Sequence, residues 1–165
     1  MTTGTPQTSG DDQKHLISEL ALRADSFRAQ GRYCESEALF RRALELAEHI
    51  FAEDDTELLP LLNNCAVLYK YSGRFDEPER MYLRALRIAE NRFGERHAAV
   101  ATIYHNLGGL EHARGNYAAG EPLARRSVEI RRELLGEEHF DVAADMAALA
   151  GILDGLRRYD ESVPI

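Results

Sequence analysis

The stretch NNCAVLYKYSGRFDEPERMYLRALRIAE, residues 63–90, contains the pattern that decides the fold. Together with the residue before it, its first part spaces small and apolar side chains as one face of a helix requires, at Leu62, Cys65, Ala66 and Tyr69. Gly73 then stands where the end of a helix needs a left-handed residue, and Asp76 is suited to begin the next helix. The stretch therefore predicts a helix, a tight turn and a second helix.

The same pattern returns every 42 residues along the chain. The turn recurs as Gly31-Arg32-Tyr33, Gly73-Arg74-Phe75 and Gly115-Asn116-Tyr117, and in a weaker form as Arg157-Arg158-Tyr159. In the same register, small residues align at Ala24, Ala66, Gly108 and Ala150, and glutamates at Glu37, Glu79 and Glu121. A repeat of this length predicts stacked helical units. We expect helices near residues 14–30, 34–51, 56–72, 76–92, 98–114, 118–134 and 140–156.

These residues resemble the tetratricopeptide repeat. The 42-residue spacing, NNCAVLY at 63–69 and the connectors GERHAAV at 94–100 and GEEHFDV at 136–142 are similar to the kinesin-light-chain type of that family. The resemblance implies an all-α fold, a right-handed superhelical solenoid of antiparallel helix pairs with about three and a half repeats. It also implies that the first helix of each pair lines a concave groove that binds peptide segments, with no catalysis and no cofactor.

The expected domain covers residues 14–165, with repeats at about 14–55, 56–97 and 98–139 and a partial repeat at 140–165. Residues 1–13, which are rich in Thr, Gly and Ser, are expected to be a disordered lead-in. The fourth repeat stops where its second helix should begin, so several apolar residues should stay partly uncovered: Met146, Leu149, Ile152, Leu153 and Leu156. Either the chain is a fragment of a longer array, or this end packs on another chain.

Composition argues against several classes of protein. No apolar run approaches the roughly 18 residues of a membrane helix, and a formal net charge of −8 argues against a nucleic-acid surface. The two cysteines, Cys34 and Cys65, form no metal-binding or disulfide pattern, which favours a reducing compartment, and both are expected to be packing thiols. We therefore expect a cytoplasmic protein with no nucleic-acid and no membrane partner.

The stretch YHNLGGLEH, residues 104–112, looks at first like a site for a metal ion or for acid–base chemistry. Its histidines, His105 and His112, lie about 10.5 Å apart along a helix axis, too far for a shared zinc ion. No activated nucleophile or second carboxylate accompanies them, so we expect no catalytic residue and no metal ligand. Glu111 replaces the Phe27, Tyr69 and Leu153 of the other repeats, and it should be partly buried and paired with an arginine.

Binding is expected in the groove, on the face of each first helix that is opposite its packing stripe. Asn64 and Asn106 align there, and the resemblance implies that asparagines at this position grip the main chain of a ligand. A basic row on an acidic protein, Arg28, Lys70 and His112, favours an anionic ligand. The expected groove residues are Arg28, Asn63, Asn64, Val67, Lys70, Tyr71, Thr102, His105, Asn106 and His112.

Two functional hypotheses follow from these observations. The first is a non-enzymatic interaction scaffold whose groove binds an extended acidic segment of a protein or peptide partner. The second is a structural assembly unit that forms a homodimer, or a longer stack, through the uncapped fourth repeat. The alternative to a binding groove is a solvated face without a specific ligand.

Overall fold

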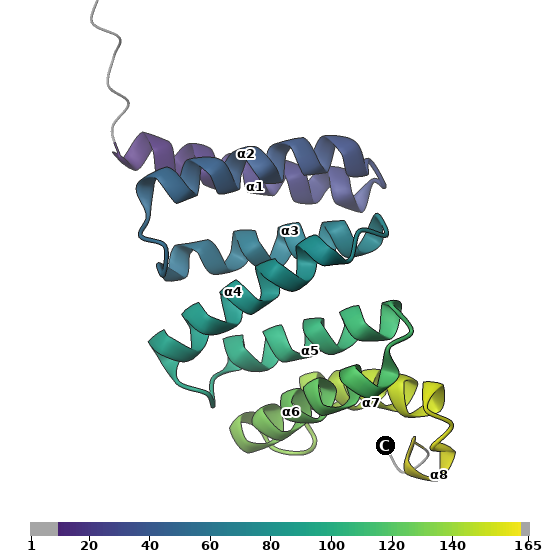
Figure 1. The fold of residues 1–165 in the computed structure, drawn as a ribbon. Coiled ribbons are helices and arrows are strands. Elements are labelled where there is room, and N and C mark those ends of the chain that lie inside the picture. The colour runs from purple at the N-terminus through teal and green to yellow at the C-terminus, as the bar shows by residue number, and fades with distance from the viewer. Residues whose placement is uncertain (1–9, 163–165) are drawn as a thin grey trace, which may run out of the picture.

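The structure is a computed structural model that describes residues 10–162. Within that range the chain forms helices joined by short turns (Figure 1). In order, they are α1 (Gly10–Ala29), α2 (Tyr33–Ile50), the 3-10 turn η1 (Thr56–Leu58), α3 (Leu59–Tyr71), α4 (Asp76–Phe93), α5 (Ala98–Ala113), α6 (Tyr117–Leu135), α7 (Phe140–Gly155) and α8 (Tyr159–Ser162).

The seven helices expected from the sequence are all present, and their ends differ from the expected ends by one residue at most, except at two starts. α3 begins at Leu59 because η1 occupies the residues just before it. α1 begins at Gly10, inside the segment 1–13 that was expected to be disordered. Asp11 and Asp12 in its first turn interact favourably with the helix dipole, which supports this early start. Residues 1–9 of that segment lie outside the described residues.

The helices pair in chain order, α1 with α2, α3 with α4 and α5 with α6, and the pairs stack one after another from the purple end of the ribbon to the yellow end (Figure 1). α1, α3, α5 and α7 also contact one another in series. We call these four the inner helices, and the side of the solenoid that they line the inner face. The stack therefore brings one helix of every repeat to a common surface.

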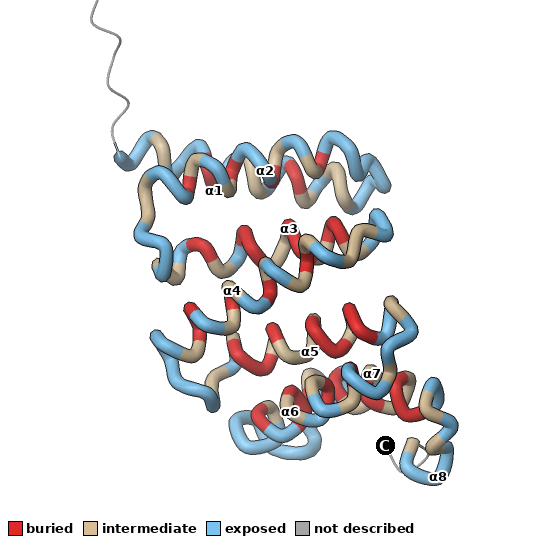
Figure 2. Tube along the Cα trace, in the orientation of Figure 1, coloured by how far each residue is buried: buried red, intermediate tan, exposed pale blue. Residues whose placement is uncertain are grey.

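Buried residues lie along the sides of the helices that face their neighbours (Figure 2). The column of small residues explains how closely the helices approach. Ala24, Ala66 and Gly108 are all buried, and a Cβ atom on Gly108 would lie 3.3 Å from the backbone nitrogen of Ala124. A larger side chain in this column would push the paired helices apart.

The turn between the two helices of a repeat needs a residue in the left-handed region. Gly31, Gly73 and Gly115 adopt φ values of 73°, 74° and 75° at this point. In the fourth repeat Arg157 takes the same place with φ 61°, a conformation that costs energy for any residue with a Cβ atom. The weak match Arg157-Arg158-Tyr159 therefore forms the same turn with a residue that fits it less well.

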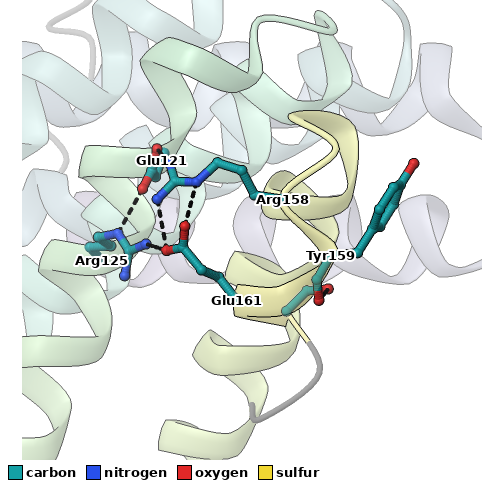
Figure 3. A network of polar contacts seen from close by, with 6 residues as sticks. Glu121, Arg125, Arg158, Tyr159 and Glu161 are labelled. Atoms are coloured by element: carbon teal, nitrogen blue, oxygen red, sulfur yellow. Dashed lines mark hydrogen bonds and ion pairs between the residues drawn. The ribbon is translucent and has the colours of Figure 1, made fainter.

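An ion pair recurs between the second helix of one repeat and the turn of the next. Arg74 lies 2.6 Å from Glu37, and Arg158 lies 2.6 Å from Glu121. Around the last pair, Figure 3 shows Glu161 of α8 between Arg158 and Arg125, at 2.7 and 3.0 Å. Four alternating charges thus hold the single turn of α8 against α6.

The expectation for the fourth repeat was wrong at three residues. Leu149, Ile152 and Leu153 are buried, because they pack with Ala124 and Val128 of α6. Met146 and Leu156 are partly buried, as expected. The exposed apolar residues of α7 lie elsewhere, at Phe140, which is 81% exposed, and at Ala143, Ala144 and Ala147.

Candidate binding groove

Asparagines connect three of the inner helices on the inner face. Asn106 of α5 donates a hydrogen bond to Asn63 Oδ1 of α3 at 2.7 Å, and Asn63 donates to Asn64 Oδ1 at 3.3 Å. Asn64 in turn donates to Asp25 Oδ2 of α1 at 3.4 Å. A carboxamide has two N–H groups and two lone pairs on oxygen, so each asparagine keeps hydrogen-bonding capacity beyond this chain of contacts.

The basic row expected on this face is not uniform. Arg28 donates two hydrogen bonds to Asp25 of its own helix, at 3.1 and 2.9 Å, so its charge is already paired. His112 is exposed, and its ring meets the ring of Tyr117 edge to face. Lys70 is half-buried, and burial lowers its pKa. The three aligned basic residues therefore differ in how accessible their side chains are to a ligand.

The other expected groove residues have distinct surroundings. Val67 packs against the main hydrophobic core, whereas Tyr71 is 62% exposed. The Thr102 hydroxyl donates to the carbonyl of Ala98 at 3.0 Å and accepts from Arg131 of α6 at 3.1 Å. Of these three, Tyr71 offers the most free surface to a ligand.

His105 does not stand free on the inner face, because it lies against Asp145 of α7. Its Nδ1 is 2.7 Å from Asp145 Oδ1, and Arg131 Nε is 3.0 Å from Asp145 Oδ2. Asp145 is only 2% exposed, and the hydroxyl of Ser127 also contacts its carboxylate. His105, whose side chain is 35% exposed, therefore belongs to a polar cluster around the buried Asp145 that joins α5, α6 and α7, and its role as a groove contact stays a prediction.

Sequence reasoning missed Asp145, although a signal for it was present. In the 42-residue register Asp145 occupies the place of Leu61 and Ile103, which are buried apolar residues. Arg131 similarly occupies the place of Ala47 and Ala89. Two charges of opposite sign that replace apolar residues in neighbouring helices predict an internal ion pair.

The cluster contains Ser127, His105 and Asp145, the residue types of a hydrolytic triad, but in another arrangement. In a triad the serine hydroxyl bonds to the histidine, and the aspartate bonds to the other side of that ring. Here Ser127 is fully buried, donates to the carbonyl of Ala101 at 2.9 Å and contacts Asp145 itself. This hydroxyl is placed to support Asp145 and is not aimed at a substrate.

Glu111 is buried and paired with an arginine, so that expectation is confirmed. It is 8% exposed, and its carboxylate accepts hydrogen bonds from Arg114 at 2.6 Å and from Asn116 at 2.7 Å. Arg114 also lies 2.8 Å from Glu79, which completes for the third repeat the ion pair that Arg74 and Arg158 make elsewhere. Glu111 is thus a structural replacement and is not exposed to a ligand.

Two shallow depressions of about 200 Å³ each lie side by side on the inner face. One lies between α1 and α3 and includes Ile17, Ala21 and Leu61 in its lining. The other lies between α3 and α5 and is lined by Leu59, Pro60, Asn63, Ala99, Thr102 and Ile103. Pro60 lines both, so the two depressions adjoin each other; the first also has the polar residues Lys14, Ser18 and Glu57 in its lining, whereas the second is mostly apolar.

The cysteines differ from each other. Cys65 is buried, and burial raises the pKa of its thiol to about 12, as expected of a packing thiol. Cys34 is exposed, so the expectation that both are packing thiols was wrong for this residue. In the part of the chain that the structure describes, no three His, Cys, Asp or Glu side chains gather as metal ligands. No helix among residues 10–162 has the length and apolar character to cross a membrane.

Several solved structures share this architecture. BtubC (BKLC) from P. vanneervenii superposes with a TM-score of 0.83 at 21% identity, over 97% of this chain and 63% of that chain. A Podosopora anserina protein assigned to the kinesin light chains, with nearly identical TPR-like repeats, gives a TM-score of 0.75 at 18% identity. That match covers 90% of this chain and 70% of the other. At these identities the likeness shows the fold alone.

Sequence comparison identifies the family. No curated protein sequence matches the chain. A family model described as tetratricopeptide repeat matches residues 16–91, 66–119 and 99–165, which together cover nearly all of it. The expected resemblance to this repeat, and to its kinesin-light-chain type in structure, is confirmed. The chain belongs to the tetratricopeptide-repeat family.

Proposed function

We propose that the protein is a non-enzymatic interaction scaffold whose inner face binds an extended acidic segment of a protein partner. The observation that carries this proposal is the hydrogen-bonded chain of Asn106, Asn63 and Asn64, which is anchored on Asp25. It holds three carboxamides in fixed positions across neighbouring repeats, so a bound main chain would not have to order them. The fold supports a scaffold role in general, and the peptide and its charge are our proposal.

The two depressions beside the asparagines support the same role. An extended chain advances about 3.3 Å per residue, with alternate side chains on opposite sides. Side chains on one side of such a segment could enter the depressions on either side of Pro60, while its peptide groups meet Asn63 and Asn64. Main-chain hydrogen bonds would then give affinity, and the depressions would select apolar side chains.

The proposal is tested by panning a random peptide library on the protein and measuring the affinity of the selected peptides. The double variant Asn64→Ala/Asn106→Ala should bind them at least about tenfold more weakly while keeping its helical circular dichroism. Asn91→Ala, which changes an exposed asparagine on α4, is the matched control and should change nothing. Unchanged binding by the double variant would rule out the groove model.

Assembly through the fourth repeat is the second candidate, and one surface feature favours it. A hollow of about 370 Å³ between α6 and α7 has Val128 and Leu149 in its lining, and its rim carries charges of both signs: Arg125, Arg132, Glu129 and Glu133. A second copy of the chain would bring complementary charges to the same rim. Phe140 on α7 would also be covered in such a homodimer.

Sedimentation velocity at micromolar concentration separates the two candidates. A dimer in the wild type that is lost in Phe140→Ser would support assembly. Tyr71→Ser, which changes an exposed aromatic residue on the inner face, is the control and should leave the dimer intact. A monomer throughout the concentration range removes the assembly hypothesis and leaves the groove proposal unaffected.

A further inference from the structure

In the described part of the chain, Lys70 has no acidic partner on the inner face, unlike Arg28 and His105; His112 has none either, but its ring packs against the ring of Tyr117. Arg28 is bound by Asp25, and His105 lies against Asp145. Among residues 10–162, no hydrogen bond or ion pair reaches the ammonium of Lys70. Lys70 therefore has an ammonium group whose donors are not used by the protein.

This ammonium extends over the next repeat. Its Nζ would lie 3.6 Å from a Cβ atom added to Gly109, so it extends from α3 over the surface of α5 at a residue that has no side chain. The ring of Tyr71 is 5.7 Å away, and the lysine is half-buried. A cation that loses water without gaining a carboxylate is poorly stabilised, and burial accordingly lowers the pKa of Lys70.

We propose that Lys70 is the anchor for one carboxylate of the bound segment, and that Arg28 makes no direct contact with it. This inference rests on the proposed function. It assigns recognition of the negative charge of the ligand to one residue of the basic row Arg28, Lys70 and His112. A carboxylate above Gly109 would accept a charge-assisted hydrogen bond from Lys70, while the asparagines of the same face hold the main chain. The exposed ring of Tyr71 would cover one side of the contact.

The charges around Lys70 determine how binding depends on pH. α1 contributes Asp25 and Arg28, which form an ion pair with each other. α5 contributes His105, which lies against Asp145, and His112, and on α4 the titratable Tyr82 is buried. A bound carboxylate would raise the pKa of Lys70 by its opposite charge. Affinity should thus be highest where free Lys70 is protonated, and should fall as pH rises through its lowered pKa.

Peptide selection tests the assignment. Peptides selected on the wild type from a random library should be enriched in Asp and Glu, and Lys70→Gln should lose this enrichment and bind the selected acidic peptides about tenfold more weakly or worse. Arg80→Gln removes one positive charge from an exposed residue of α4, outside the inner helices, and should behave like the wild type. Arg28→Gln removes the neighbouring positive charge, leaves Asp25 in place as the anchor of Asn64, and should also retain the enrichment.

The chain has only two lysines, which allows a direct readout. After reductive methylation with ¹³C-formaldehyde, two dimethyl-lysine signals report on Lys14 and Lys70. Both ammoniums lie 5.7 Å from an aromatic ring, and Lys14 is exposed, so the two signals can be compared within one sample. The selected acidic peptide should shift the titration of the Lys70 signal to higher pH.

The outcomes separate this inference from the proposed function. If the wild type selects peptides and Lys70→Gln selects equally acidic ones, or if the Lys70 signal ignores the peptide, the Lys70 assignment is wrong and the groove proposal stands. If the wild type selects no peptide at all, both are wrong. Loss of acidic enrichment in Lys70→Gln, with the Arg80→Gln and Arg28→Gln controls unchanged, supports the assignment.

Discussion

Asn116 donates a hydrogen bond to Glu111 at 2.7 Å. In the 42-residue register Asn116 occupies the position of Arg74 and Glu111 that of Tyr69, and in the second repeat Arg74 stacks over the ring of Tyr69. The first repeat has the same stacking, with Arg32 4.1 Å from the ring centroid of Phe27. Both partners are therefore replaced together in the third repeat, a cation–π contact by a hydrogen-bonded pair. The glutamate then also recruits Arg114, which bridges to Glu79.

Introducing the cation–π pair of the other repeats at residues 111 and 116 should recover part of the stability that Glu111→Tyr alone removes. Glu111→Tyr should destabilise the protein, because Asn116 and Arg114 lose their buried acceptor. Adding Asn116→Arg should recover about 0.5–1 kcal/mol through the ring contact. Urea unfolding of the wild type, both single variants and the double variant measures this coupling. Strictly additive changes in unfolding free energy would show that the residues at 111 and 116 do not interact as a pair.

Asp145 should be the most sensitive polar residue of the fourth repeat. Asp145→Ala removes the buried one of two carboxylates that pair with Arg131, whose side chain is 14% exposed, and leaves only the partly exposed Asp141 at 3.3 Å; it should cost about 3 kcal/mol of unfolding free energy. Asp145→Ile/Arg131→Ala, which returns both positions to the residue types of the other repeats, should lose much less. Urea unfolding measures both, and a double variant as unstable as Asp145→Ala would show that the ion pair is not the cause.

Two glycines of α7 should respond differently to the same substitution. A Cβ atom on Gly155 would lie 2.5 Å from the ring of Tyr117, whereas one on Gly151 would meet its nearest neighbour, His112, at 3.6 Å. Gly151→Ala should raise stability by up to about 1 kcal/mol through helix propensity. Gly155→Ala should lower the melting temperature, because the new methyl group meets the Tyr117 ring. In a Tyr117→Ala background the same substitution should no longer carry this cost. Equal effects of alanine at both glycines would show that the Tyr117 ring does not restrict residue 155.

Arg157→Gly should stabilise the last turn. Arg157 has φ 61°, and a residue with a Cβ atom costs about 1–2 kcal/mol there, part of which the greater freedom of glycine in the unfolded chain offsets. We expect a net gain of about 0.5–1 kcal/mol by urea unfolding. Gly115→Ala, the reverse change in the preceding turn, should lose stability by a similar amount, and a gain in that variant would contradict the argument.

The positions of the helices could be predicted because their signals are local. The spacing of Cys65, Ala66 and Tyr69 and the glycine at Gly73 act within one or two helical turns, and the 42-residue register carries the same signals to the other repeats. The buried Glu111 was also predictable, since a carboxylate in a column of apolar residues needs a cation. At the fourth repeat the same reasoning failed, because α6 covers Leu149, Ile152 and Leu153.

The sequence alone therefore determined the repeat, the helices and the family of this protein, and it predicted which residues share the inner face. Only the tertiary structure decided which of them are free. Arg28 is paired with Asp25, His105 lies against Asp145, and Lys70 is left without an acidic partner over Gly109. The physical reason is that a helix position fixes the direction of a side chain, whereas its partner depends on what the neighbouring repeat brings within a few ångströms.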